Sequence, residues 1–147
     1  MTSRLRWLAL PLLLVASHAS ACDQATAIND FLTEHQPDDA GKPVIQITRK
    51  GYHQGRERTA IVFTYQINAN RERFDEWFVI FDGCESGEPI SVGYPGRQHI
   101  ESISIGADGI TLGGFRWQLG DAMCCPTKTV AFRIEEAPEG SIRLIPI

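Results

Sequence analysis

The sequence predicts a mainly β domain of the α+β class, with one N-terminal helix packed on a twisted antiparallel meander of about eight strands, curled or partly closed. Three observations predict this fold. One stretch near the start has helical spacing, the remainder alternates apolar and polar residues with period two, and Gly-, Pro- and Asp-rich turns interrupt the alternation at short intervals. Short connections favour antiparallel pairing of sequential strands. A half-open β-sandwich is the competing arrangement.

The helix is predicted from Asp23, a good N-cap residue, to about His35. Residues at helical spacing form one face that we expect to pack on the sheet: Ala25, Ile28, Phe31, Leu32 and His35. We interpret His35 as the polar edge of that face rather than as a ligand. Proline and glycine residues between 37 and 43 end the helix.

The alternating pattern predicts strands over residues 44–50, 59–67, 76–82, 89–94, 100–105, 110–119, 128–135 and 141–147. The run 76–82 is apolar on both parities, which is typical of a central strand covered on both faces, and the helix is expected to be one cover. In 110–119 the apolar parity changes at Gly113–Gly114. We expect a bulge there that returns Phe115, Trp117 and Leu119 to the core face.

The first residues predict export. Arg4 and Arg6 precede a short apolar run over 7–15, and small residues follow at 19–21. This order is typical of a secretory signal peptide, and the run is shorter than the roughly 20 residues that span a bilayer. Cleavage after Ala21 would leave Cys22 first, so an acylated lipoprotein anchored at Cys22 is the alternative to a plain secreted or periplasmic protein.

The predicted organisation is therefore a signal peptide over 1–21 and a single β-rich domain over 22–147. Removing the signal from the 147-residue chain leaves 126 residues, enough for one core. The signal contains two arginines and no acid, so the mature chain has 12 basic and 18 acidic residues and a net charge of −6. This balance argues against nucleic acid or an anionic membrane surface as a partner.

An up-and-down meander places alternate turns at opposite ends of the sheet. One end would hold the turns near Tyr52, Cys84, Asp108 and Pro138, and the other the loops near Arg71, Arg97 and Cys124. Strands of this length span roughly 20–30 Å, whereas disulfide-bonded Cα atoms lie about 4.4–6.8 Å apart. We therefore expect Cys84 not to reach Cys124 or Cys125. A helix returning along the sheet would instead bring Cys22 to Cys84, and we predict that disulfide if Cys22 is not acylated.

Cys124 and Cys125 are adjacent, and their Cα atoms are about 3.8 Å apart across a trans peptide, below the usual disulfide range. A strained vicinal bridge is one reading of this pair. The other is a pair of thiols, one of them buried and one packed against Pro126.

The hairpin 100–112 and the segment Gly120-Asp121-Ala122-Met123-Cys124-Cys125-Pro126-Thr127 together resemble a group of secreted bacterial β-domains with an Asp-x-Met-Cys-Cys-Pro-Thr/Ser motif, of the LppP/LprE lipoprotein type. The resemblance implies a secreted or cell-envelope β-domain and brings no catalytic residues. Where such domains often have an acidic turn before the second strand, this chain has the segment 53–58, which puts a calcium-binding role for that turn in doubt.

The leading functional hypothesis is a non-enzymatic binding or structural module of the cell envelope that needs no cofactor. Its site would lie at the end formed by the loops 68–75, 94–99 and 120–127, because loops commonly carry function. The candidate binding residues there are Arg71, Arg73, Tyr94, Arg97, His99 and Met123. The partner would be an envelope protein, a glycan or a small ligand, and a variant of this hypothesis is an inhibitor of a secreted hydrolase.

A thiol-redox protein that uses Cys124 and Cys125 is the alternative from another class. The pair lacks the Cys-x-x-Cys spacing, and His99 is the one histidine expected at that end to serve as a base. Adjacent cysteines also lack the ligand spacing of a zinc site, so no metal is predicted. Neither a serine-nucleophile nor a phosphate-binding motif occurs, and we expect no enzymatic activity.

Overall fold

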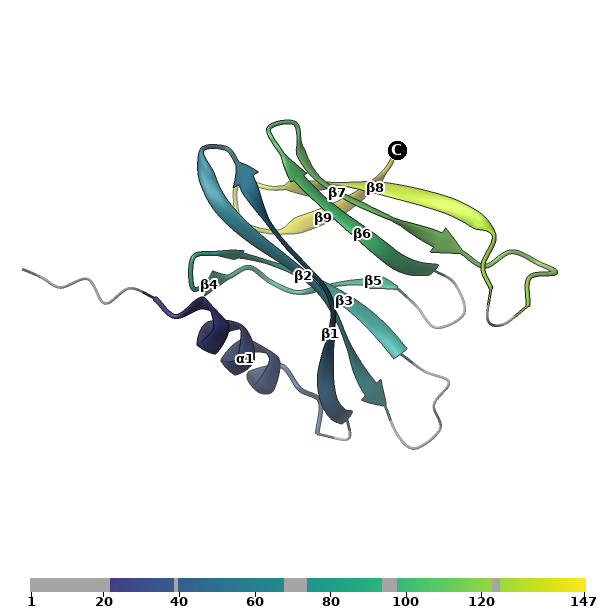
Figure 1. Cartoon of the computed structure of the whole chain (residues 1–147), viewed down its shortest axis with the longest axis horizontal. Helices are drawn as coiled ribbons and strands as arrows, with labels where there is room; N and C mark the ends of the chain where they lie inside the picture. The colour runs from purple at the N-terminus through teal and green to yellow at the C-terminus, as the bar shows by residue number, and fades with distance from the viewer. Residues whose placement is uncertain (1–21, 39, 68–73, 94–97, 123–124) are drawn as a thin grey trace, which may run out of the picture.

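The computed structural model describes residues 22–38, 40–67, 74–93, 98–122 and 125–147 (Figure 1). Within them, the chain forms one helix and nine strands: α1 (Gln24–Glu34), β1 (Ala40–His53), β2 (Arg56–Ile67), β3 (Phe74–Asp82), β4 (Glu85–Ser86), β5 (Ile90–Gly93), β6 (Gln98–Gly106), β7 (Gly109–Arg116), β8 (Lys128–Glu136) and β9 (Ile142–Pro146). The predicted mainly β class is confirmed. No helix among these residues is long and apolar enough to cross a membrane.

The strands form two antiparallel sheets rather than one curled meander. The first sheet has the order β1-β2-β3, with β4 and β5 both pairing with β3, and the second has the order β6-β7-β8-β9. The prediction of one continuous, partly closed sheet is therefore wrong between β5 and β6, where the chain passes from one sheet to the other. The described strands do not close into a barrel, and the layout is nearer to the half-open sandwich.

The main core lies between the two sheets. It joins the inner faces of β2, β3 and β5 to those of β6, β7 and β8 through Ala60, Val62, Phe78, Ile80, Val92, Ile100, Ile103, Ile110, Leu112, Phe132 and Ile134. Fully burying one such large side chain stabilises the fold by about 1.5–3 kcal/mol. Both sheets contribute alternating apolar residues to one core. The alternation in the sequence therefore does not distinguish one curled meander from two stacked sheets.

Helix α1 covers the outer face of the first sheet, as predicted (Figure 1). Asp23 is the N-cap, and its carboxylate accepts a hydrogen bond from the Ala25 N–H at 3.1 Å. Phe31 and Leu32 are buried on a second cluster that contains Ile61, Phe63, Tyr65, Val79 and Phe81. The Tyr65 hydroxyl donates to the Leu32 carbonyl at 2.9 Å. Strand β3 is thus covered on both faces, which confirms the interpretation of its continuous apolar run.

The predicted bulge is present opposite Gly113–Gly114, but the extra residue belongs to the neighbouring strand β6 and not to β7. Ile100 pairs with Gly114 and Ser102 with Gly113, so Glu101 of β6 is the extra residue. A Cβ at Gly114 would collide with the carbonyl oxygen of His99. The two glycines of β7 therefore let β6 approach closely, and the bulge keeps both apolar halves of β6 directed at the core.

Because β7 itself has no bulge, its C-terminal aromatic half does not return to the core. Phe115 stays half-buried on the opposite face from Leu112. The strand ends at Arg116 rather than at Leu119, and the side chain of Leu119 is fully exposed. The expectation that Phe115, Trp117 and Leu119 share the core face is wrong for this reason.

Strand β6 crosses the first sheet diagonally. At its start the Gln98 side-chain amide donates to the Val92 carbonyl of β5. At its end Ile105 packs so closely on β1 that a Cβ at Gly51 would lie 2.7 Å from the Ile105 Cβ. The crossing brings the turns after His53, Asp82, Gly106 and Glu136 to one end of the molecule, the hairpin end. The strand ends at Ile67, Gly93 and Arg116 lie at the other, the loop end. This division agrees with the predicted alternation of turns.

Candidate functional site

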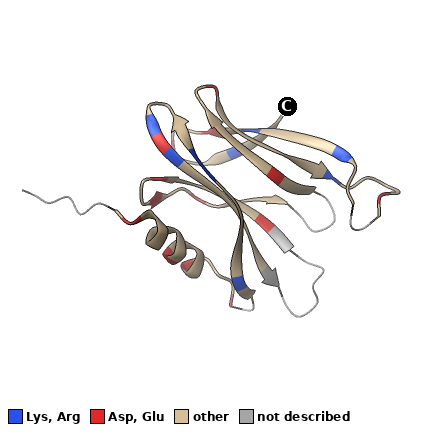
Figure 2. Ribbon diagram, in the orientation of Figure 1, with Lys and Arg blue, Asp and Glu red and all other residues tan. Residues whose placement is uncertain are grey.

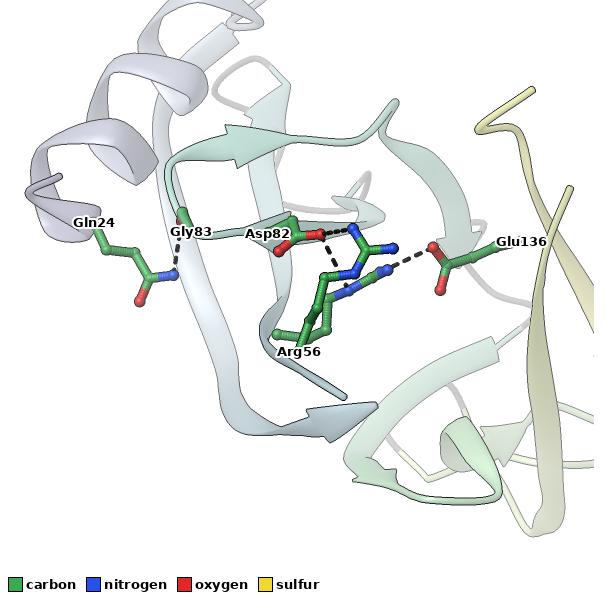
Figure 3. A network of polar contacts seen from close by, with 6 residues as sticks. Gln24, Arg56, Asp82, Gly83 and Glu136 are labelled. Atoms are coloured by element: carbon green, nitrogen blue, oxygen red, sulfur yellow. Dashed lines mark hydrogen bonds and ion pairs between the residues drawn. The ribbon is translucent and has the colours of Figure 1, made fainter. Parts of the chain in front are cut away.

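The hairpin end is tied covalently to the N-terminus of α1. Cys22 and Cys84 form a disulfide with their Cα atoms 6.0 Å apart, which confirms the predicted pair. Next to it, the Gln24 side-chain amide donates to the Gly83 carbonyl at 2.9 Å (Figure 3). The start of the helix is thereby fixed to the turn between β3 and β4.

A charged network links the two sheets at the same end. The Arg58 guanidinium of β2 donates from Nη1 to Glu136 Oε2 of β8 at 2.9 Å, and the Arg58 side chain is only 7% exposed. Its Nε lies 3.7 Å from Asp82 Oδ2, too far for a hydrogen bond, so this contact is electrostatic. Figure 3 shows Arg56 and Glu136 converging on this region with Asp82, and Arg56 Nη1 lies 2.6 Å from Asp82 Oδ2. Two arginines and two carboxylates neutralise one another, as expected of a structural link rather than an anion site.

At the loop end a buried carboxylate performs the corresponding link. Glu76 of β3 is 5% exposed, and its Oε2 accepts a hydrogen bond from the Ile100 N–H of β6 at 2.9 Å. Its Oε1 pairs with Nδ1 of His99. Gly93 lies opposite Glu76 in the register, where a Cβ would be 2.8 Å from the Glu76 Cβ. Glycine at this position makes room for the carboxylate between the sheets.

Sequence reasoning missed Glu76, although one signal was present. It is the only charged residue among the first residues of the apolar run 76–82. A charge at the start of a strand that is buried on both faces requires a partner. The partner could not be identified beforehand, because Glu76 and His99 belong to different sheets.

His99 is the one predicted binding residue that the structure describes. It lies at the loop end as expected, and its side chain is 39% exposed. Because Nδ1 is engaged by Glu76, the half-exposed ring can present Nε2 to a ligand. Arg71, Arg73, Tyr94, Arg97 and Met123 lie outside the described residues, and their convergence stays a prediction. Within the part of the chain that the structure describes, no group of three acidic, histidine or cysteine side chains could hold a metal ion.

The segment after β7 is closed on itself by Asp121. Its Oδ2 accepts from the backbone N–H groups of Gln118 at 2.8 Å and Thr127 at 3.0 Å, and its Oδ1 accepts from the Thr127 hydroxyl at 2.8 Å. The Gln118 amide and then the Thr127 hydroxyl are the main causes that lower the pKa of Asp121 below its ordinary value. Asp121 and Thr127, the first and last residues of the motif, are thus hydrogen-bonded to each other.

Of the cysteine doublet, the structure describes Cys125. Cys125 is disulfide-bonded, and its N–H donates to the Ala122 carbonyl at 2.9 Å. Cys124 lies outside the described residues, so the predicted vicinal bridge is not described. The thiol-redox hypothesis stays a prediction. Leu119 lies on the same turn, one residue beyond Gln118, with its side chain fully exposed.

Comparison with known proteins gave no family-model match, and neither the curated proteins nor the solved structures include a similar chain.

Proposed function

We propose that this protein is an exported cell-envelope domain, without enzymatic activity, that binds a protein partner through its loop end. The observation that carries the proposal is the exposed Leu119 on a turn whose ends are held by Asp121. The mechanism is recognition by a preordered surface rather than chemistry.

Exposure of one leucine is ordinary on protein surfaces, so the argument rests on the order of the turn that presents it. A connection that only joins β7 to β8 requires no internal bracing. Here Asp121 accepts three hydrogen bonds across the turn. Ordering a binding loop in advance reduces the entropy lost on association, which is how a small surface gains affinity.

The strand ends beside the proposed surface, at the start of β6 and the end of β7, are also held in place. Glu76 fixes the start of β6 on the first sheet and orients the ring of His99. Arg116, at the end of β7, donates from Nη2 to the Gln98 side-chain oxygen at 3.2 Å. Binding sites built on such supported strands keep their geometry better than sites on unsupported loops.

The Cys22–Cys84 disulfide supports export to an oxidising compartment, the periplasm or the exterior. It also favours the unacylated form, because a thioether-linked lipid would take the sulfur that bridges to Cys84. The signal peptide over 1–21 stays part of the proposal on sequence grounds. No observation favours the inhibitor or thiol-redox alternatives over this reading.

Affinity capture with matched variants tests the proposal. The intact disulfide-bonded protein is immobilised and exposed to an envelope extract of its native organism, alongside Leu119→Ser and Ile147→Ser. Ile147 is a second large exposed apolar side chain, which follows β9 beside Ala131 in the middle of β8, and serves as the control. We expect a discrete protein retained by the wild type and by Ile147→Ser, and retained about tenfold less by Leu119→Ser. Equal retention by all three proteins would contradict the assignment of the loop end.

A further inference from the structure

Strand β1 forms an edge of the first sheet, although Ala40 at its start is hydrogen-bonded to Pro37 and Gln36 and its end at Gly51–His53 packs against β6. It pairs with β2 from Ala40 to His53, and no other described strand is hydrogen-bonded to its far side (Figure 1). From Ile47 to His53 the register is uninterrupted. An edge strand of this length presents a row of backbone N–H and C=O groups that can pair with another extended chain.

The side chains of β1 are positively charged, whereas the chain as a whole is acidic. The whole chain has a net charge of −4, yet β1 contains Lys42, Arg49 and Lys50 and no acidic residue. All three are exposed, and the ion pairs between described residues do not include them. Figure 2 shows basic residues on the β1–β2 hairpin, with an acidic segment between those near its turn.

The basic residues lie on both faces of the strand. Arg49 pairs with Ala60, whose side chain faces the second sheet, and Lys50 pairs with Thr59, which shares the parity of the helix-covered residues. A partner strand alternates its own side chains between the same two faces. Acidic residues at neighbouring positions of that strand could therefore each meet a cation. Val44 and Ile45, 51% and 43% exposed, add apolar contacts farther along the edge.

We propose that β1 binds an extended acidic segment of a partner protein as an added antiparallel or parallel strand. This surface is separate from the loop end and does not depend on the function proposed there. A second copy of β1 is the wrong occupant, because it would bring Arg49, Lys50 and Lys42 of two chains together without an acidic residue. Basic residues, Pro43 and the register shift between Ile45 and Ile47 are devices that prevent self-pairing of edges. The same charges favour an acidic partner by complementarity.

The probe for this proposal is a capped peptide of roughly eight residues in which pairs of adjacent glutamates alternate with pairs of valines, so that acidic side chains reach both faces, and it is long enough for a typical strand. It is titrated into the intact disulfide-bonded protein, with backbone amide resonances and amide exchange as readouts. We expect shifts in β1, and slower exchange at every second β1 amide, because only outward N–H groups gain a partner. Added salt should weaken binding.

Two charge-matched double variants give the specificity test. Arg49→Glu with Lys50→Glu should weaken the peptide about tenfold, whereas Lys128→Glu with Arg133→Glu, the same charge change on exposed residues of β8, should not. If the charge reversal perturbs folding, the milder pair Arg49→Gln with Lys50→Gln replaces it. This pair should weaken peptide binding by about threefold.

Three results would overturn the proposal. The first is the absence of β1 shifts at millimolar peptide, and the second is equal weakening by the β1 and β8 variants. The third is concentration-dependent dimerisation of the protein alone through β1, measured by sedimentation, which would make a second copy the occupant.

Discussion

The hairpin end and the loop end of this protein hold the same two sheets together by different means. The hairpin end has a disulfide from Cys22 to Cys84, the ion pair of the buried Arg58 with Glu136 and direct contact of Gly51 with Ile105. The loop end uses carboxylates within hydrogen-bonding range of backbone N–H groups, at Glu76 and Asp121. The difference indicates that long-range stability is concentrated where turns are short, which leaves the opposite end free to present longer connections.

The largest expected effect is loss of the disulfide. Its ends are separated by 62 residues in sequence, and closing such a loop stabilises the fold by about 4 kcal/mol in the chain-entropy model. The double variant Cys22→Ser, Cys84→Ser should lose roughly that amount in urea unfolding. An unfolding free energy within about 1 kcal/mol of the wild type would show that the disulfide contributes little to holding the hairpin end.

The ion pair of the buried Arg58 should have the next largest effect. Glu136→Ala leaves the Arg58 guanidinium, 7% exposed, without its hydrogen-bond acceptor and should cost about 3 kcal/mol, as is typical when the partner of a buried charge is removed. Adding Arg58→Met to Glu136→Ala should recover part of the loss, because the unpaired buried charge is gone. Chemical unfolding of the two single variants and the double variant measures this coupling. Strict additivity would argue that the two side chains act independently.

At the loop end, Glu76→Ala should cost about 2 kcal/mol, because it leaves the Ile100 N–H buried without an acceptor. Glu76→Gln keeps an acceptor oxygen of similar shape and should cost less than about 1 kcal/mol. The comparison predicts that both losses are smaller than that of Glu136→Ala, measured by the same urea unfolding. A larger loss for Glu76→Ala would reverse the proposed ranking of the two ends.

The smallest effect on global stability should come from Asp121. Its hydrogen bonds from Gln118 and Thr127 lower its pKa below the ordinary value of 3.8. A lowered folded-state pKa means that the brace is fully present above that ordinary value and is lost as pH falls through the lower, folded-state value. Amide exchange corrected for intrinsic pH dependence should therefore show Gln118 and Thr127 losing protection at low pH while the core residue Val62 keeps its own.

The variant Asp121→Asn provides the control for the pH experiment. It should have weakly protected Gln118 and Thr127 amides at every pH, because a neutral amide is a poorer acceptor than a carboxylate. If the wild-type protection is unchanged between neutral pH and pH values well below 3.8, the carboxylate does not brace the turn.

Local patterns predicted the helix and the strands, because their signals are local. The N-cap at Asp23 and the two-sided apolar run of β3 were both found from neighbouring residues. Alternation of turns was also sufficient to predict the Cys22–Cys84 pair, since strand direction alternates in either architecture. The bulge was correctly predicted beside Gly113–Gly114, because these glycines mark a close approach of backbones.

The split into two sheets could not be predicted in the same way. It depends on whether β5 and β6 exchange hydrogen bonds, and neither strand has a side-chain pattern that specifies its neighbour. Glu76 and Arg58 are buried by residues from the other sheet, at sequence separations of 24 and 78 from their hydrogen-bond partners Ile100 and Glu136. Leu119 was assigned to the core because parity alone does not reveal that a strand has already ended.

Site-specific photocrosslinking in the native host tests the division between the two ends most directly. A photoreactive residue is placed at Leu119 on the loop end or at Asp108 in the exposed turn of the hairpin end. The account predicts a discrete covalent adduct from position 119, reduced by an excess of wild-type protein, and none from position 108. An adduct from position 108 together with none from position 119 would contradict it.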